Sequence, residues 1–252
     1  MEDYRPETYG DRIADLYDQM VVGLPDPADC VDRLVELAGP GPALELGIGT
    51  GRVALPLAAR GVRVHGVDAS AAMVERLRAK PGGESIEVTL GDFAGVPVAP
   101  VEGGYPLVYV VFNTLFSLLT QDDQVRCFAE VPGRLAPGGA FVVEAFVPDP
   151  TLHPGGQSVR TRHLGLDLVQ FDVALHDPVA QRVDFQHVLL AGDGTRLLPG
   201  AIRYAWPAEL DLMARMAGLR VRERWGGWRR EPFGAASGLH VSVYEHAGAA
   251  AS

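Results

Sequence analysis

The segment ALELGIGTGR, residues 43–52, constrains the fold of this chain more than any other feature. An apolar run of strand type leads into Gly47, Gly49 and Gly51, and a helical pattern follows. Glycine permits a tight turn and lets a ligand approach the backbone closely. The N-terminus of the following helix supplies N–H groups that point at such a ligand. The segment therefore predicts a ligand-binding turn between the first strand and helix of an α/β sheet.

Three kinds of ligand loop resemble this turn. A phosphate-binding P-loop would end in Gly-Lys-Ser or Gly-Lys-Thr, whereas Arg52 and Val53 follow Gly51 here. A dinucleotide fingerprint would place Gly or Ala where Arg52 stands, so that helix and strand can pack closely. The third kind is the E-x-G-x-G-x-G loop of S-adenosylmethionine enzymes. Glu45 favours it, because a carboxylate can hold the ammonium of a methionine moiety but would repel a pyrophosphate.

Acidic residues also follow the next two predicted strands. Asp68 lies 21 positions after Gly47, where a carboxylate would accept hydrogen bonds from both ribose hydroxyls of NAD or of S-adenosylmethionine. Asp92 is placed to accept from an adenine amine, and Met73 and Phe93 are placed to flank the base, although core packing explains these two equally well. Three successive strand ends thus indicate one ligand-binding edge of the sheet.

The first two thirds of the chain alternate apolar runs with helical patterns, which predicts a parallel sheet with right-handed crossovers. The expected strands are Ala43–Leu46, Val62–Val67, Ile86–Leu90, Leu107–Phe112 and Ala140–Phe146. The expected helices are Arg52–Arg60, Ala71–Lys80 capped by Ser70, and Asp122–Leu135 capped by Thr120. Pro132 and Gly133 predict a kink or an early end in the last of these helices.

The pattern changes after Pro150. Three runs separated by turn signals predict an antiparallel meander: Leu166–His176, Arg182–Leu190 and Leu197–Tyr204. A helix from Pro207 to about Ala217 and two strands, Leu219–Trp225 and Leu239–Glu245, then complete the α/β pattern. We expect the tail, residues 247–252, to be disordered.

The strings ELGIGTGR, VDAS followed by Met73, GDF and LAPGG resemble successive motifs of class I S-adenosylmethionine-dependent methyltransferases. The resemblance implies a Rossmann-like α/β fold with a seven-stranded sheet of order 3-2-1-4-5-7-6 and an antiparallel last strand. The meander is similar to the insertion in N,N-dimethyltransferases of nucleotide-linked amino sugars. FNTLFSL, residues 112–118, and residues 205–221 resemble peptide N-terminal methyltransferases of the cypemycin type.

This family resemblance also implies a domain layout and a cofactor site. Residues 1–40 form N-terminal lid helices, 41–150 and 205–246 bind S-adenosyl-L-methionine, and 151–204 form an antiparallel insertion near the substrate pocket. Tyr9 resembles the lid tyrosine that closes over the cofactor, and Tyr17 is either a second such residue or a core residue. The expected cofactor residues are Tyr9, Glu45, Gly47, Gly49, Thr50, Gly51, Arg52, Asp68, Ala69, Met73, Gly91, Asp92, Phe93, Phe112 and Asn113.

Methyl transfer from a sulfonium requires a nucleophile held roughly 3 to 3.5 Å from the methyl carbon and in line with the breaking bond. A base would take the proton of an ammonium or hydroxyl acceptor, and the candidates are Glu144, His153 and His240, each of which also has a structural explanation. The expected walls of the substrate pocket are Tyr17, Phe116, Phe146, Tyr204 and Trp206. They suit a small molecule or a short peptide of secondary metabolism, with an amine as the favoured acceptor.

Two other functions compete with methyl transfer. One is an NAD-dependent oxidoreductase, against which Glu45 and Arg52 argue. The other is a protein that binds S-adenosylmethionine but catalyses different chemistry or serves as a partner subunit, since the loop indicates binding and not reaction.

Composition limits the possible partners. The net charge of −10 argues against nucleic acid, because such binding depends on Lys and Arg displacing counterions. The chain shows neither a signal peptide nor an apolar run of roughly 20 residues, so we expect a cytoplasmic protein without membrane contact. Cys30 and Cys127 stand alone, and the seven histidines show no metal-binding spacing, so we expect no metal. A monomer or a homodimer is expected.

Overall fold

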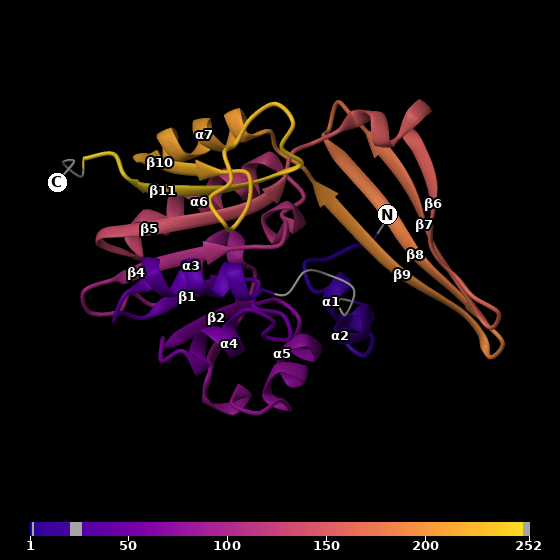
Figure 1. Ribbon diagram of the computed structural model, residues 1–252, viewed down its shortest axis with the longest axis horizontal. Helices are drawn as coiled ribbons and strands as arrows, with labels where there is room; N and C mark the ends of the chain where they lie inside the picture. Colours follow the sequence, from indigo (N-terminus) through magenta and orange to yellow (C-terminus); the bar gives the residue numbers. More distant parts are fainter. Residues whose placement is uncertain (2, 21–26, 249–252) are drawn as a thin grey trace.

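The computed structural model describes residue 1 and residues 3–20 and 27–248 (Figure 1). Its main element is a seven-stranded sheet of order β10-β11-β5-β4-β1-β2-β3. β1 to β5 are parallel to one another, and β11 is antiparallel to both β5 and β10. The predicted class I order is therefore confirmed. The strands are β1 (Ala43–Leu46), β2 (Val64–Asp68), β3 (Glu87–Leu90), β4 (Tyr105–Val110), β5 (Leu135–Phe146), β10 (Leu219–Trp225) and β11 (Leu239–His246).

Helices cover both faces of this sheet, as a buried parallel sheet requires. Leu34 of α3 and Leu57 of α4 belong to the apolar core on one face, and Phe128 of α6 and Leu210 of α7 belong to the core on the other face. The α-helices are α1 (Thr8–Ile13), α2 (Tyr17–Met20), α3 (Ala28–Ala38), α4 (Ala54–Ala59), α5 (Ala71–Arg78), α6 (Gln121–Glu130) and α7 (Pro207–Met216). None of the described helices is long and apolar enough to span a membrane.

Short 3₁₀ turns connect several of these elements. They are η1 (Gly83–Ser85), η2 (Phe93–Gly95), η3 (Thr114–Ser117), η4 (Val131–Gly133), η5 (Pro150–Leu152) and η6 (Pro154–Gly156). α6 ends at Glu130, and η4 contains Pro132, so the predicted early end of this helix is confirmed. The predicted caps are also present: the Ser70 side chain accepts from Met73 N–H and the Thr120 side chain from Asp123 N–H.

The predicted meander is a separate antiparallel sheet of four strands in the order β6-β7-β8-β9. The strands are β6 (Gln157–Leu164), β7 (Leu168–Asp177), β8 (Arg182–Ala191) and β9 (Gly194–Arg203). The sequence pattern does not predict β6, because this exposed edge strand, QSVRTRHL, shows little apolar alternation. The sheet projects from the side of the molecule at which the parallel strands end (Figure 1).

The N-terminal helices lie between this projecting sheet and the rest of the molecule (Figure 1). Ile13 of α1 and Met73 of α5 form one apolar cluster with Leu198 of β9. A Cβ at Gly10 would lie 2.5 Å from Ser70 Cβ, so α1 can approach α5 this closely only because residue 10 is glycine. Of the predicted disordered tail, residues 249–252 lie outside the described residues.

Candidate active site

The glycine turn after β1 combines close packing with an opening toward a cavity. Gly47, Gly49 and Gly51 have φ values of 76°, 54° and 80°. A Cβ would lie 2.3 Å from Thr114 Cγ2 at Gly47 and 2.3 Å from Leu77 Cδ1 at Gly51, but it would meet no atom within 4 Å at Gly49. The outer two glycines are therefore needed for packing, whereas Gly49 leaves its backbone open to a ligand.

Asp68 at the end of β2 is hydrogen-bonded to the glycine turn. Its carboxylate accepts from Gly49 N–H at 2.7 Å and from Ser70 N–H at 2.9 Å. Burial raises the pKa of Asp68, and the backbone hydrogen bonds oppose this shift. Ser70 Oγ donates in turn to Asp11 of α1 at 2.6 Å, so hydrogen bonds connect the glycine turn, β2 and the N-terminal helix.

Asp92, Phe93 and Met73 form a third part of this edge. The Asp92 carboxylate caps η2 by accepting from Ala94 N–H at 2.9 Å. Phe93 and Met73 are buried and also line the cavity, so both interpretations of these residues, packing and ligand contact, have structural support.

Glu45 lies deeper than the other acids of this edge. It is 4% exposed, and Tyr109 Oη donates to its Oε2 at 2.9 Å. Burial raises the pKa of Glu45 to about 8, and the nearby Asp68 carboxylate acts in the same direction. Without a cationic partner, Glu45 is therefore mostly protonated at neutral pH.

These residues surround a cavity of about 600 Å³ along the carboxyl edge of the parallel strands. The lining residues come from two sets of elements. The parallel strands β1, β2 and β3, the turn after β4 and the start of α5 supply one set, called the first end: Gly47, Gly49, Asp68, Ala69, Ser70, Met73, Asp92, Phe93, Phe112, Asn113 and Thr114. The N-terminal segment, residues 117–123, the last residue of β5 and the projecting sheet supply the other set, called the second end: Tyr4, Arg5, Pro6, Tyr9, Gly10, Tyr17, Ser117, Leu118, Leu119, Asp123, Phe146, Arg162, Phe185, Ala201 and Ile202.

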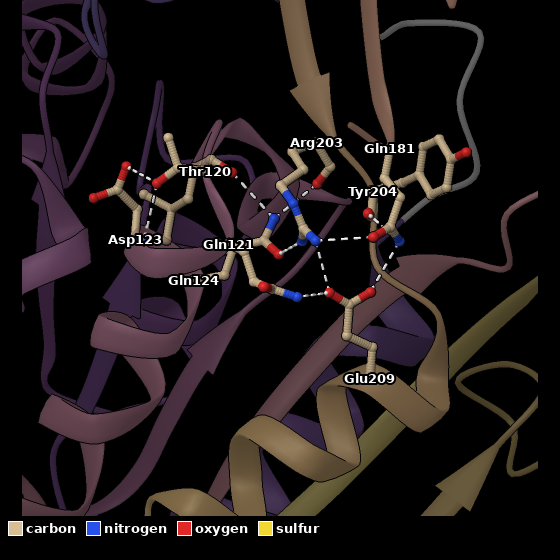
Figure 2. Close-up of polar contacts among 9 residues, drawn as sticks. Thr120, Gln121, Asp123, Gln124, Gln181, Arg203, Tyr204 and Glu209 are labelled. Carbon is tan, nitrogen blue, oxygen red and sulfur yellow. Dashed lines mark hydrogen bonds and ion pairs between the residues drawn. The ribbon is translucent and has the colours of Figure 1, made fainter. Parts of the chain in front are cut away.

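A buried polar network connects the projecting sheet to α6 and α7 (Figure 2). Arg203 of β9 donates to Gln124 of α6 at 2.6 Å and to Glu209 of α7 at 2.7 Å. Gln124 is fully buried and donates to the carbonyl of Leu118, a cavity residue, at 3.1 Å. Gln181, in the turn just before β8, also accepts a hydrogen bond from Arg203. This wall of the cavity is therefore held by contacts among three parts of the fold.

The structure does not bring the three predicted bases to the cavity. Glu144 accepts from the N–H of Phe112, a cavity residue, at 2.8 Å but does not itself line the cavity. His240 is fully buried and contacts Ser242 Oγ through Nδ1 at 2.8 Å, and burial lowers its pKa to about 4. His153 contacts Ser158 Oγ at 2.9 Å. Since none of them lines the cavity, the geometry does not favour a proton transfer from the acceptor to any of the three.

Among the predicted walls of the substrate pocket, Tyr17 and Phe146 line the cavity. Phe116 is fully buried behind Phe146, with ring centroids 5.0 Å apart. Tyr204 contacts His176 Nε2 at 2.9 Å, and Trp206 is exposed before α7, so neither forms part of the wall.

Five of the predicted cofactor residues support the cavity from outside its lining, and one of them is the buried Glu45. Thr50 Oγ1 donates to Asp18 at 2.7 Å, and the Arg52 guanidinium lies 4.7 Å from the centre of the Phe112 ring. Gly51 packs against Leu77, and Gly91 N–H donates to the Asp68 carbonyl.

Several residues of the cavity lining are not predicted by the sequence. Gly10 and Ser70 directly adjoin predicted residues, so their neighbours could have indicated them. Arg162, Phe185 and Ile202 lie on the projecting sheet, and no local motif indicates them, because only the tertiary fold turns that sheet toward the cavity.

Comparison with known proteins agrees with this geometry. Residues 43–139 match the family model described as a methyltransferase domain. The chain is 29% identical over 205 residues to the cypemycin N-terminal methyltransferase of a Streptomyces species, covering 80% of this chain and 82% of that protein.

Solved structures extend the similarity to the whole chain. The CcbJ methyltransferase from Streptomyces caelestis is 42% identical, with a TM-score of 0.90 over 97% of this chain and 100% of that one. Streptomyces venezuelae DesVI shares the fold at 20% identity, with a TM-score of 0.69 over 91% of this chain and 97% of that one.

Proposed function

Because the chain belongs to the class I S-adenosylmethionine-dependent methyltransferases, we propose that it methylates an amine of a small molecule or short peptide of secondary metabolism. The observation that carries this proposal is the composition of the cavity lining. The parallel sheet contributes glycines and acids to it, and the N-terminal segment and the projecting sheet contribute mainly aromatic, aliphatic and arginine side chains. The relative named an N-terminal methyltransferase supports an amine, because a peptide N-terminus is one.

The residues at the first end fit S-adenosylmethionine. Gly49 leaves open space where a Cβ would stand, and the carboxylate of Asp68 lies beside it. We assign Asp68 to the ribose hydroxyls, Asp92 to the adenine amine, and Met73 and Phe93 to the faces of the base. Glu45 is assigned to the methionine ammonium, which would stabilise its carboxylate form.

When bound, this cofactor supplies a methyl group on a positively charged sulfur. The protein's part is to hold the acceptor in line, exclude water and leave the acceptor nitrogen unprotonated. The phenols of Tyr9 and Tyr17 line the cavity, and burial raises both pKa values, that of Tyr17 to about 12. Both therefore stay neutral at physiological pH, so they can accept or donate a hydrogen bond at the acceptor without adding charge.

The proposal is tested with matched acceptors. The purified protein is incubated with S-adenosylmethionine and a short peptide with a free N-terminus, the same peptide N-acetylated, prolinamide and a phenol. The expected result is formation of S-adenosylhomocysteine and addition of methyl groups to the free amines only. Asp68→Ala serves as the control, since it removes the acceptor of the Gly49 N–H and should abolish turnover.

Methylation of the phenol without methylation of either amine would overturn the amine assignment while leaving the enzyme class intact. No turnover with any acceptor, in a protein that binds S-adenosylhomocysteine, would overturn the choice of acceptor class.

A further inference from the structure

The turn after β4 places two non-glycine residues in the left-handed region of backbone space. Phe112 has a φ of 58° and Asn113 a φ of 64°. Asparagine tolerates this conformation, but it is unfavourable for a residue with a bulky side chain such as phenylalanine. Both residues line the cavity, so the strained backbone lies at the candidate active site. Such a conformation persists only where surrounding contacts hold it.

Glu144 at the end of β5 supplies two of the contacts that maintain the turn. Its Oε2 accepts from Phe112 N–H at 2.8 Å, and its backbone carbonyl accepts from Asn113 N–H at 3.2 Å. Asn113 Oδ1 accepts from Phe146 N–H at 2.6 Å, which joins the turn to β5 a second time. Trp228, in the loop between β10 and β11, also hydrogen-bonds to the Glu144 carboxylate.

The position of this turn determines the shape of the cofactor end. The Cγ2 of Thr114 occupies the space where a Cβ of Gly47 would lie, and the Phe112 ring lies under the Arg52 guanidinium. A relaxation at residues 112 and 113 would move both contacts, and with them the glycine turn.

We propose that Glu144 is a positioning residue, which holds Phe112 and Asn113 in the left-handed conformation that S-adenosylmethionine binding requires. Its carboxylate serves as a hydrogen-bond acceptor for a backbone N–H and takes no proton from the methyl acceptor. This inference depends on the cofactor cavity and is independent of which acceptor the enzyme methylates.

Two substitutions separate this role from the alternatives. Glu144→Gln keeps an acceptor oxygen at the same distance from the backbone but removes the charge. Glu144→Asp keeps the charge but withdraws it by one methylene, out of reach of Phe112 N–H. The measurement is the affinity for S-adenosylhomocysteine by calorimetry, which involves no proton transfer from an acceptor, together with thermal unfolding of each variant.

We expect Glu144→Gln to bind within about threefold of the wild type and Glu144→Asp to lose about tenfold or more. Trp228→Phe is the matched control, because it removes the other donor to Glu144 and leaves the Phe112 hydrogen bond. It should bind within about twofold of the wild type.

The opposite order, with Asp binding and Gln failing, would show that charge matters and would overturn the proposal. Unchanged binding in both variants would overturn it as well, because that is the result expected of a general base. A loss in Trp228→Phe as large as in Glu144→Asp would assign the effect to the loop between β10 and β11, again against the proposal.

Discussion

Three glutamate and aspartate side chains near the carboxyl edge of the sheet have different hydrogen-bond partners. Asp68 accepts from two backbone N–H groups, Glu45 only from the Tyr109 hydroxyl among the contacts described, and Glu144 from the strained turn after β4. Burial raises the pKa of all three. The role of each carboxyl group therefore depends on the groups that it contacts. The pH dependence of cofactor binding can distinguish these roles.

Glu45 should make cofactor affinity pH-dependent. Its pKa of about 8 means that the ligand-free protein must release a proton before a carboxylate can meet the ligand ammonium. The free-energy cost of deprotonating Glu45 therefore weakens binding below about pH 8 and disappears above it. We expect the affinity for S-adenosylhomocysteine to rise between about pH 6 and about pH 8, by at most about tenfold per pH unit.

Glu45→Gln is the control for this linkage. Calorimetry in buffers of different ionisation enthalpy should show proton release on binding to the wild type and none on binding to the variant. Equal pH dependence in the two proteins would contradict the assignment of Glu45 to the ligand ammonium.

His240 should reduce stability in acid. Burial lowers its pKa from the ordinary 6.5 to about 4, so the unfolded chain binds a proton more readily than the folded one. The free energy of unfolding therefore falls as the pH drops from about 6.5 toward about 4, by about 3 kcal/mol from this residue. In urea titrations at several pH values, the free energy of unfolding of His240→Gln should fall less in acid than that of the wild type. An equal fall in the two proteins would show that His240 does not cause the loss of stability.

Local sequence was sufficient to predict residues at strand ends. Gly47, Gly49, Asp68 and Asp92 line the cavity, and they were recognisable because a ligand loop and the acids after each strand have fixed spacings. Their contact with the cofactor stays a prediction. Glu144 was predicted to lie at the end of the fifth strand, as it does, but its hydrogen bonds do not favour the predicted role of a base. Its contact with the left-handed turn could not be predicted, because the two lie 32 residues apart in the chain and no sequence spacing indicates such a contact.

At the level of elements, the connection of the projecting sheet to α6 and α7 depends on buried polar contacts. Arg203 and Glu209 side chains are 6% and 17% exposed, and they also hydrogen-bond to Gln121, Gln124 and Gln181. A buried ion pair of this kind contributes little net stability when complete, but removing one partner leaves a buried charge without compensation.

Arg203→Met should therefore be strongly destabilising. We expect a loss of about 3 to 5 kcal/mol in the free energy of unfolding, measured by urea titration, because Glu209 would remain buried without its cation. Arg60→Met is the matched control, since Arg60 and its partner Asp32 are each 52% exposed. Its cost should stay below about 1 kcal/mol. A similar loss of unfolding free energy in the two variants would show that burial of the Arg203–Glu209 ion pair does not determine its effect on stability.

Element boundaries were predicted well where the pattern of apolar residues was strong. β1 begins and ends at the predicted residues, and the caps of α5 and α6 are the predicted Ser70 and Thr120. β6 was not predicted, because an exposed edge strand needs no apolar face. The Arg203 network was not predicted either, because its members come from β9, α6, α7 and the turn before β8, and only the fold brings them together.

At the scale of the whole molecule, the apolar cores join regions that the sequence separates. One core contains Leu44 and Val108 of the parallel sheet together with Ala174 and Val183 of the projecting sheet. A second cluster joins Ile13 of the N-terminal segment to Leu198 of β9. We therefore regard residues 151–204 as an insertion that completes the core and not as an independently folding unit.

The chain should accordingly unfold as one cooperative unit. In scanning calorimetry we expect a single transition whose van't Hoff and calorimetric enthalpies agree. If S-adenosylhomocysteine binds at the residues assigned to the cofactor, it contacts mainly the parallel sheet. It should nevertheless move the whole transition upward, by about 2.7 kcal/mol of stability at a hundredfold excess over Kd. A second transition that the ligand leaves in place would show that the projecting sheet melts alone. In that case the buried contacts of Arg203 and the shared core would not couple the sheet to the cofactor site, and the acceptor end of the cavity would be free to change shape without disturbing cofactor binding.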